Sequence, residues 1–303
     1  MVEARRSPPQ HPAGAGILAL SPHLDDAVLS LGGHLARLAS GGERVLVATF
    51  YTAGPVDGVA HPALEAFANL DQRRREDADA LGALGATPRW LGLVERAFRP
   101  PALTHPLQTF ATPDGRDWPH LDELERITCA LLDELPGALV LVPLAIGQHV
   151  DHVAVFAAAC RALVSRGALG RARFYEDAYA ICRTARSRHF VTRAHPLPWW
   201  RSNELSSVYA AGLSALVLAG RRGRRPEEWI PVEVREGRWH LDPLPLDGFA
   251  AVKECAIRSY ASQLRAMGGA DGTCRLLARQ ARLLGGAEAI WWVEPAAPAG
   301  AEA

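Results

Sequence analysis

The chain has 303 residues, of which 49% are hydrophobic and 22% charged, a composition typical of a water-soluble globular protein. Basic and acidic residues are equally numerous, 33 of each, so the formal net charge is zero and a basic nucleic-acid-binding domain is excluded. The length allows one large domain or two small ones, with a core of ordinary size.

The ends of the chain and its cysteines predict a cytoplasmic protein with no membrane partner. Arg5 and Arg6 are followed by two prolines, and the nearby apolar run GILAL is too short for the core of a signal peptide. The apolar run that ends at Gly220 has about half of the ~20 residues that a membrane span needs. The five cysteines form no CxxC motif, which favours reduced thiols over a metal or redox site.

Short apolar runs alternate with longer segments of helical periodicity in the first part of the chain. The predicted strands are GILAL to residue 20, RVLVATF to 50, RWLGLV to 94, ALVLVPL to 144 and RARFYE to 176. The predicted helices cover residues 27–39, 64–84, 121–135 and 153–164. Because most strand runs are continuously apolar, they indicate parallel strands buried on both faces. The alternation therefore predicts an α/β fold, a doubly wound and mostly parallel sheet flanked by helices.

The later part of the chain predicts a C-terminal extension made of a hairpin and helices. The runs WIPVEV and RWHL flank Gly237 and suggest a hairpin within residues 223–246. Helices are expected over 252–267 and 273–284, and AIWWVE suggests a last strand. We expect a single domain over residues 13–293, with a disordered leader, 1–12, and a disordered tail, 294–303.

The first group of chemically active residues is SPHLDDAVLSLGG, which follows the first predicted strand and opens the first helix. His23 and Asp26 are three residues apart, so at a helix start they fall on one side and can share a metal ion. Asp25 could stay within reach of a water on that ion. The alternative is that Asp25 or Asp26 simply caps the helix, as aspartate commonly does.

The second group is GQHVDHVAV, which follows the fourth predicted strand and opens another helix. His149, Asp151 and His152 stand together in it, and imidazoles and carboxylates are standard zinc ligands. Alone, two of these histidines could be surface residues. Ligands of an open α/β sheet gather at the carboxyl ends of its strands, and both groups belong to that edge. Together they predict a metal site, whereas no GxGxxG or GxSxG motif supports dinucleotide binding or a serine hydrolase.

These two motifs resemble those of the LmbE-like (PIG-L) N-deacetylase family, whose signatures are P-H-P-D-D-E and H-x-D-H. This chain has PHLDDA over residues 22–27 and HVDH over 149–152. The resemblance implies a Rossmann-like domain with zinc, or alternatively ferrous iron, as the cofactor. It also implies the role of each residue: His23, Asp26 and His152 as metal ligands, Asp25 as general base, His149 as the group that stabilises the oxyanion or protonates the leaving amine, and Asp151 as the partner that orients a histidine.

The resemblance is specific as far as Asp177 and looser beyond it. Residues 74–85 resemble a basic-acidic helix of the family, and the segments YED at 175–177 and YASQ at 260–263 also have counterparts. Leu24 replaces a proline of the signature and Ala27 replaces its glutamate. Neither position matches a metal ligand, so the departures concern the substrate rather than the chemistry.

The expected function is removal of an N-acetyl group from a small molecule or glycoconjugate that contains N-acetylglucosamine. Arg74 and Arg75 offer cations that could hydrogen-bond sugar hydroxyls, and the loops 53–63, 96–120 and 183–205 are expected to set specificity. The alternatives are an amidase of the same scaffold that acts on another N-acyl or conjugate substrate, a sugar-binding protein without turnover, and a metal phosphoesterase. The expected partner is a small amino-sugar substrate and not a nucleic acid, and a homo-oligomer is compatible with the sequence.

Overall fold

The computed structural model describes residues 12, 14–55, 65–178, 183–195, 211–212, 214–215, 219–220 and 222–296. The predicted leader apart from Pro12, the predicted tail beyond residue 296, and parts of the loops 53–63 and 183–205 lie outside the described residues.

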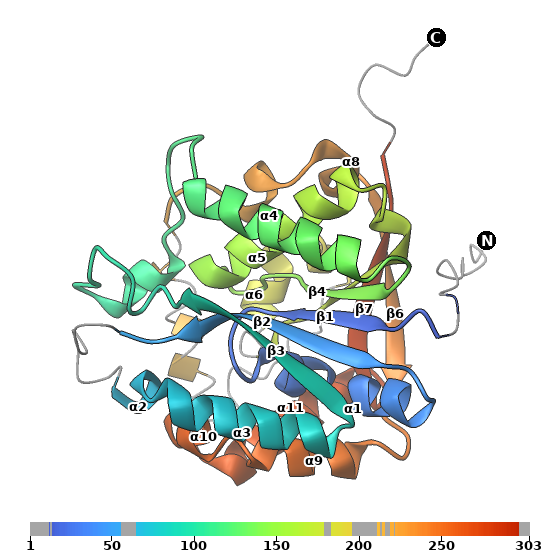
Figure 1. Ribbon diagram of the computed structural model, residues 1–303. Coiled ribbons are helices and arrows are strands. Elements are labelled where there is room, and N and C mark those ends of the chain that lie inside the picture. Colours follow the sequence, from blue (N-terminus) through green and yellow to red (C-terminus); the bar gives the residue numbers. More distant parts are fainter. Residues whose placement is uncertain are drawn as a thin grey trace.

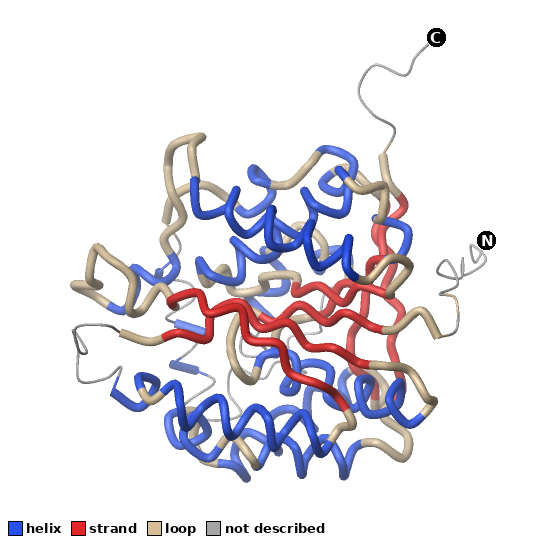
Figure 2. Tube along the Cα trace, viewed as in Figure 1, coloured by secondary structure: helices blue, strands red, loops and turns tan. Residues whose placement is uncertain are grey.

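A seven-stranded sheet with the strand order β3-β2-β1-β4-β5-β7-β6 crosses the middle of the molecule (Figures 1 and 2). Its strands are β1 (Ile17–Ser21), β2 (Val45–Ala53), β3 (Ala86–Val94), β4 (Leu139–Pro143), β5 (Ala172–Tyr175), β6 (Arg238–Pro245) and β7 (Ala287–Glu294). The first five strands pair in parallel, and β7 runs antiparallel to both β5 and β6. The predicted mostly parallel α/β sheet is confirmed.

Helices cover both faces of the sheet, with α1, α3, α9, α10 and α11 on one side and α4 and α5 on the other (Figure 1). The helices are α1 (Asp26–Ser40), α2 (Glu65–Ala68), α3 (Leu70–Ala83), α4 (Pro119–Glu134), α5 (Val150–Ser165), α6 (Arg183–Arg188), α8 (Val232–Arg235), α9 (Ala250–Arg258), α10 (Ala261–Ala266) and α11 (Ala270–Leu283). Short 3-10 helices are η2 (Pro106–Phe110), η3 (Leu169–Arg171), η5 (Thr192–Ala194) and η7 (Pro226–Trp229).

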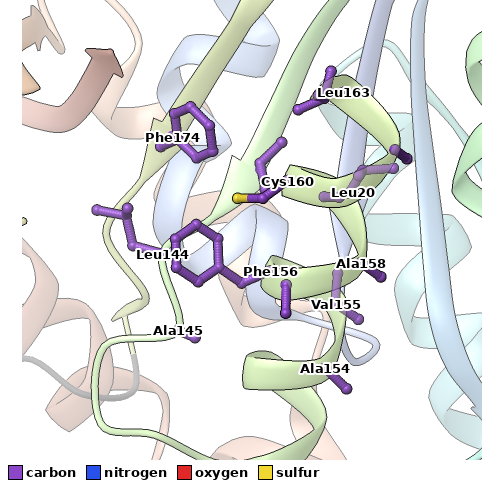
Figure 3. Packing of buried hydrophobic residues seen from close by; sticks show 14 of the residues in the cluster. Leu20, Leu144, Ala145, Ala154, Val155, Phe156, Ala158, Cys160, Leu163 and Phe174 are labelled. Carbon is purple, nitrogen blue, oxygen red and sulfur yellow. The ribbon is translucent and has the colours of Figure 1, made fainter. Parts of the chain in front are cut away.

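Helix α5 is the most deeply buried helix on its side of the sheet, and its sequence explains why. Its residues from Val150 to Cys160 are all buried, because the sheet covers one side and α4 another. Figure 3 shows Phe156 and Cys160 of α5 beside Phe174 of β5, with Leu144 after β4 completing the contact. A helix that is apolar all round belongs in a core. The buried core therefore extends to the first turn of α5, where the HVDH motif lies.

Two predicted helices are each divided in two. Asn69 accepts a hydrogen bond from the Gln72 backbone N–H and so starts α3 separately from α2. The segment expected as one helix over 252–267 bends at Tyr260 between α9 and α10. In both cases the apolar periodicity continues through the break, which explains why the pattern predicted one helix.

The predicted hairpin within residues 223–246 is wrong. Only its second limb is a strand, β6, and that strand pairs with β7. The first limb instead forms η7 and α8, with Pro231, which has no N–H to donate to a ladder, at the N-cap of α8. Gly237 is needed for close packing, since a Cβ there would lie 2.5 Å from Val293 Cγ2 and 2.7 Å from the Glu294 carbonyl oxygen.

Among the described residues, no helix combines the length and the apolar character that a bilayer span requires. Strand β7 extends through Glu294, and the Ala296 N–H donates to the Glu233 carbonyl, so the first residues of the predicted tail are structured.

Candidate metal centre

The two predicted motifs meet because β1 and β4 are adjacent strands. The chain passes from β1 outward to β2 and β3, then returns to place β4 on the other side of β1. This reversal is the topological switch point of an open α/β sheet, where ligands bind in the crevice beyond the carboxyl ends of the strands. The SPHLDD motif follows β1 and the HVDH motif follows β4, so both enter the crevice.

Three side-chain atoms form a nearly regular triangle at this point. His23 Nδ1 lies 3.2 Å from Asp26 Oδ2, His152 Nε2 lies 3.1 Å from the same oxygen, and the two nitrogens are 3.2 Å apart. Nitrogen or oxygen ligands at about 2.0–2.1 Å from a tetrahedral zinc ion lie about 3.3 Å from one another. The three residues predicted as ligands therefore fit one face of a small divalent cation's coordination shell.

His149 lies beside this triangle. Its ring faces His23 edge-on at 5.1 Å between centroids, and ring nitrogens of His23, His149 and His152 lie within 4.8 Å of one another. These three histidines are thus a second conceivable ligand set. The triangle that includes Asp26 is tighter and contains a carboxylate, so it fits a divalent ion better.

Each histidine of the triangle has a carboxylate on its other ring nitrogen. His23 Nε2 lies 3.2 Å from Asp151 Oδ2, and His152 Nδ1 lies 2.6 Å from Asp177 Oδ1. Such carboxylates fix the tautomer and orientation of metal-binding imidazoles. Asp151 was predicted to orient a histidine, and the geometry gives it His23. Asp177 was noted only within the YED segment; its position just after β5, at the edge shared with both motifs, was the available signal.

The electrostatics of the cluster suit a cation. Burial tends to lower the pKa of His23, but hydrogen bonds with Asp151 and Asp26 outweigh it and leave that pKa well above its usual value. Burial has the same tendency at His152, where Asp26 and Asp177 raise the pKa to about 9. Burial would raise the pKa of Asp26, yet His152 and His23 hold it well below its usual range. Carboxylates that hold protons on two imidazoles would equally hold a divalent cation, which displaces those protons on binding.

Asp25 does not behave as a helix cap. It occupies the N-cap position of α1 but makes no capping hydrogen bond, and the Ala27 N–H instead donates to Ser21 Oγ. Its φ of 143° lies in a region that non-glycine residues rarely occupy, at a cost of roughly 1–3 kcal/mol. Burial and the neighbouring charge of Asp26 raise the pKa of Asp25 well above its ordinary value. The position is therefore strained and electrostatically unusual, as functional positions often are.

Arg74 and Arg75, which the sequence predicted as sugar contacts, lie on α3, but the buried arginine of that helix is Arg73. Arg74 donates to the Thr52 carbonyl and pairs with Asp71, and Arg75 is exposed. Arg73 is buried and pairs with Glu95 at the end of β3, and its charge acts on Asp25. The sequence run of three arginines gave no means of telling which one points inward.

The YASQ segment attaches α10 to α3. Tyr260 donates its hydroxyl to Asp77, and Ser262 donates both its N–H and its hydroxyl to Glu76. Gln263 accepts from Arg73 at 2.9 Å and donates to the Leu24 carbonyl at 2.7 Å. The last bond reaches the residue before Asp25, so the C-terminal part of the chain supports the first motif directly.

Comparison with known proteins finds a match to one family model and several similar folds. Residues 18–163 match the model of the family described as PIG-L, GlcNAc-PI de-N-acetylase. No curated protein matches the chain. The crystal structure of the A40926 pseudoaglycone deacetylase Dbv21 is 25% identical, covers 94% of this chain and 99% of its own, and has a TM-score of 0.63.

Structures of a deacetylase from the teicoplanin biosynthetic pathway are also similar. A triple mutant of this protein, Orf2*T, is 23% identical with a TM-score of 0.65, over 94% of this chain and all of that one. The zinc-inhibited form of teicoplanin deacetylase Orf2 is 23% identical with a TM-score of 0.64, over 93% and 99% of the two chains. The likeness in fold therefore extends well beyond residue 163.

Proposed function

Residues 18–163 of this chain match the PIG-L family model, and on that premise we propose that the protein removes an N-acetyl group from a substrate containing N-acetylglucosamine, with a divalent metal ion as cofactor. The observation that carries the proposal is the triangle of His23 Nδ1, Asp26 Oδ2 and His152 Nε2, with edges of 3.1–3.2 Å, beside Asp25 and His149. These three residues would hold the ion. When bound, such an ion lowers the pKa of a water molecule and polarises the scissile carbonyl.

Asp25 is proposed as the general base. A carboxylate with a raised pKa is a better proton acceptor than an ordinary aspartate, because its affinity for the proton lies closer to the working pH. The backbone on both sides keeps the side chain in place: Asp26 begins α1, and the Leu24 carbonyl is held by Gln263. Asp25 is thereby oriented to take the proton from the attacking water.

His149 is proposed as a neutral hydrogen-bond donor to the developing oxyanion. Its Nδ1 accepts the backbone N–H of Asp151 at 3.3 Å, so the neutral ring carries its proton on Nε2. Burial lowers the pKa of His149 to about 3, which favours this neutral form. Of the two roles that the family resemblance implies, stabilisation of the oxyanion is therefore better supported than proton donation by an imidazolium.

Zinc is proposed as the metal, with ferrous iron as the alternative. Two imidazoles and one carboxylate form a known set of catalytic zinc ligands, but the same residues also suit ferrous iron. The similar teicoplanin deacetylase Orf2 is described in a zinc-inhibited form. Activity should therefore be measured against the amount of each added metal, and inhibition by excess zinc is to be expected if this chain behaves alike.

The test of the reaction is acetate release by metal-loaded protein from a panel of N-acetylglucosamine conjugates. Asp25→Asn should keep the metal while losing about 10²–10⁴-fold in turnover. Asp133→Asn, the same change at an exposed carboxylate on α4, should leave the rate unchanged. His23→Ala and His152→Ala should each lose the ion. Full metal content in both histidine variants would contradict the assignment of the metal ligands, and near-normal turnover in Asp25→Asn would contradict the assignment of the general base.

The rival proposal is an amidase of the same scaffold with another N-acyl or conjugate substrate. The similarity to the A40926 pseudoaglycone deacetylase Dbv21, at 25% identity, favours acetyl as the group removed and a larger conjugate as the substrate. The two proposals separate in the same assay when acetyl is replaced by longer acyl chains on one sugar. Faster cleavage of the longer chains, or cleavage of non-sugar amides only, would favour the rival.

A further inference from the structure

The segment between β3 and α4 touches the HVDH motif at two points. In the blue-to-red colouring of Figure 1 this teal segment extends from the left edge of the sheet, past the carboxyl ends of its strands. Arg96 and Arg99, near its start, bind Asp151. Phe110, further along, places its ring edge-on to His149 with 5.9 Å between centroids. A segment distant in sequence therefore surrounds the first turn of α5.

The carboxylate of Asp151 is held on both oxygens. Oδ2 accepts the backbone N–H of Arg96 at 2.8 Å and faces His23 Nε2 at 3.2 Å, while Oδ1 accepts a hydrogen bond from Arg99 Nη2. Asp151 itself is completely buried. Removal of the Arg99 bond would leave one oxygen without its charged partner, and the carboxylate could then rotate away from His23.

The guanidinium of Arg99 is fixed on its other sides as well. Its Nη1 donates to His120 Nε2, and its Cζ lies 5.0 Å from the centre of the Tyr51 ring. The Tyr51 hydroxyl oxygen lies 2.7 Å from the same His120 nitrogen. His120 Nδ1 lies 3.3 Å from Glu123 Oε2, so the ring carries its proton on Nδ1 and accepts on Nε2.

These contacts close a ring of five side chains from five places in the fold. The ring consists of His23, Asp151, Arg99, His120 and Tyr51, and it closes where the His23 and Tyr51 rings lie 5.7 Å apart. The two amino groups of the planar guanidinium meet Asp151 and His120 from fixed and separate directions, a geometry that the single ammonium nitrogen of lysine does not reproduce. The arginine therefore has a specific geometric task rather than a general electrostatic one.

We propose that Arg99 is a positioning residue, which holds Asp151 and through it keeps His23 oriented with Nδ1 toward the metal. The inference rests on the proposed function, because it assumes that His23 binds the ion. Outer partners of metal-binding histidines typically change metal affinity by about 10–100-fold when they are replaced. Since Arg99 acts through one intervening carboxylate, we expect its loss to cost about 10-fold.

The experiment is a titration of metal-stripped protein with Co²⁺, followed by visible absorption, which reports both affinity and the geometry of the ligands. Arg99→Met should weaken Co²⁺ binding about 10-fold and change the spectrum in the same way as Asp151→Asn. Arg99→Lys, which keeps the charge but not the bridge, should fall between Arg99→Met and the unchanged protein. Arg89→Met is the matched control, because Arg89 pairs with Glu134 in the open, away from the crevice, and it should bind Co²⁺ normally.

A double variant makes the test specific to the route through Asp151. If Arg99 acts through that carboxylate, Asp151→Asn combined with Arg99→Met should lose no more affinity than Asp151→Asn alone. Losses that add, or an unchanged affinity and spectrum in both Arg99 variants, would overturn the proposal. Absence of Co²⁺ binding by the unchanged protein would instead overturn the proposed function and this inference with it. If Arg99→Met does not fold, Arg99→Lys decides the question alone.

Discussion

The side chains around His152 show how strictly single residues define this site. One ring nitrogen belongs to the triangle with His23 and Asp26, and the other lies 2.6 Å from Asp177. Asp177 is buried and also accepts the Ile146 N–H at 2.8 Å, so it cannot turn away from the imidazole without losing a second bond. The orientation of the proposed metal ligand His152 is thus fixed by the protein itself.

The first prediction concerns this carboxylate. Asp177→Asn keeps the shape of the side chain but removes the charge that supports the His152 ring, so metal affinity should fall about 10–100-fold. Isothermal titration of metal-stripped protein with zinc measures the change. Asp133→Asn, at an exposed ion pair, serves as the control. Equal zinc affinity in the two variants would show that Asp177 only packs against His152.

His34 provides the second prediction, because its side chain is half-buried and its buried Nδ1 has no hydrogen-bond partner in the described part of the chain. Burial lowers the pKa of His34 from 6.5 to about 4. Between these values the unfolded chain binds a proton that the folded chain does not, so stability is lost as the pH falls from about 6.5 to 4. The loss attributable to this group is at most about 3 kcal/mol.

The measurement for His34 is urea unfolding at pH 7.5 and at pH 5. Other groups also titrate in this range, so the informative quantity is the difference between the unchanged protein and His34→Leu. The variant should lose clearly less stability on acidification. Parallel losses in both proteins would mean that His34 is already solvated in the folded state.

Among single residues, the six at the centre of the proposed site could be predicted from the sequence, but the residues that hydrogen-bond to them could not. His23, Asp25, Asp26, His149, Asp151 and His152 stand in two compact motifs, each directly after an apolar strand. Arg99 is a single residue in a long segment, and nothing in its spacing relates it to a histidine. Asp177 directly follows a predicted strand, but the sequence does not say which strand lies beside that one. Only the arrangement of the strands shows that Asp177 follows the strand beside β4.

Helix α10 has only six residues but contacts the loop that carries Asp25. Its residue Gln263 donates to the Leu24 carbonyl and accepts from Arg73, so it joins α3 to the loop that carries Asp25. Hydrophobic periodicity predicted helices in this region. It could not show that their polar residues face inward, because buried polar groups satisfied by distant partners leave no periodic pattern.

The third prediction follows from this connection. Gln263→Ala removes hydrogen bonds to a buried guanidinium and to a backbone carbonyl, so unfolding free energy should fall by about 2 kcal/mol. Because the Leu24 carbonyl is released next to Asp25, turnover should also fall, roughly 10-fold, since small misplacements of catalytic groups are costly. Gln280→Ala on α11 is the control. A loss of stability without any loss of turnover would show that α10 supports the fold alone.

Over the whole molecule, the C-terminal part completes a site whose proposed ligands all lie within the first 152 residues. The family match ends at residue 163, yet Asp177, Gln263 and the strand β7 lie beyond it. Strand β7 also carries Glu288, whose two oxygens accept the N–H groups of Gly33 and His34 in the middle of α1. The sequence predicted β7 as a strand but not this contact, which depends on elements some 250 residues apart.

Lys253 of α9 completes the contact, with its Nζ 2.7 Å from Glu288 Oε1 and 3.3 Å from the Ser30 carbonyl. Both charged side chains are buried. The glycine pair in α1 makes room for Lys253 and for Leu246: a Cβ at Gly32 would lie 3.0 Å from Lys253 Cγ, and one at Gly33 would lie 2.1 Å from Leu246 Cδ2. The ion pair between Lys253 and Glu288 is thus hydrogen-bonded to the backbone of α1, the helix that begins with Asp26.

The fourth prediction is that Lys253→Met destabilises the whole protein. It leaves the Glu288 carboxylate buried without its cation, and loss of one partner of a buried pair typically costs 3–5 kcal/mol. Since Gly33 and His34 still donate to the carboxylate, we expect the lower end, about 3 kcal/mol. Arg258→Gln is the matched control: Arg258 lies on the same helix, but its pairs with Glu254 and Asp271 are exposed and should contribute no more than about 1 kcal/mol.

Urea unfolding followed by far-ultraviolet circular dichroism measures both variants under one set of conditions. The difference between them isolates the buried pair, because each loses one positive charge from α9. If the connection to α1 matters as described, amide hydrogen exchange at Gly33 and His34 should also quicken in Lys253→Met and not in Arg258→Gln. Equal stabilities would mean that Glu288 is protonated or solvated in the folded protein, and that α1 is held by its apolar contacts alone.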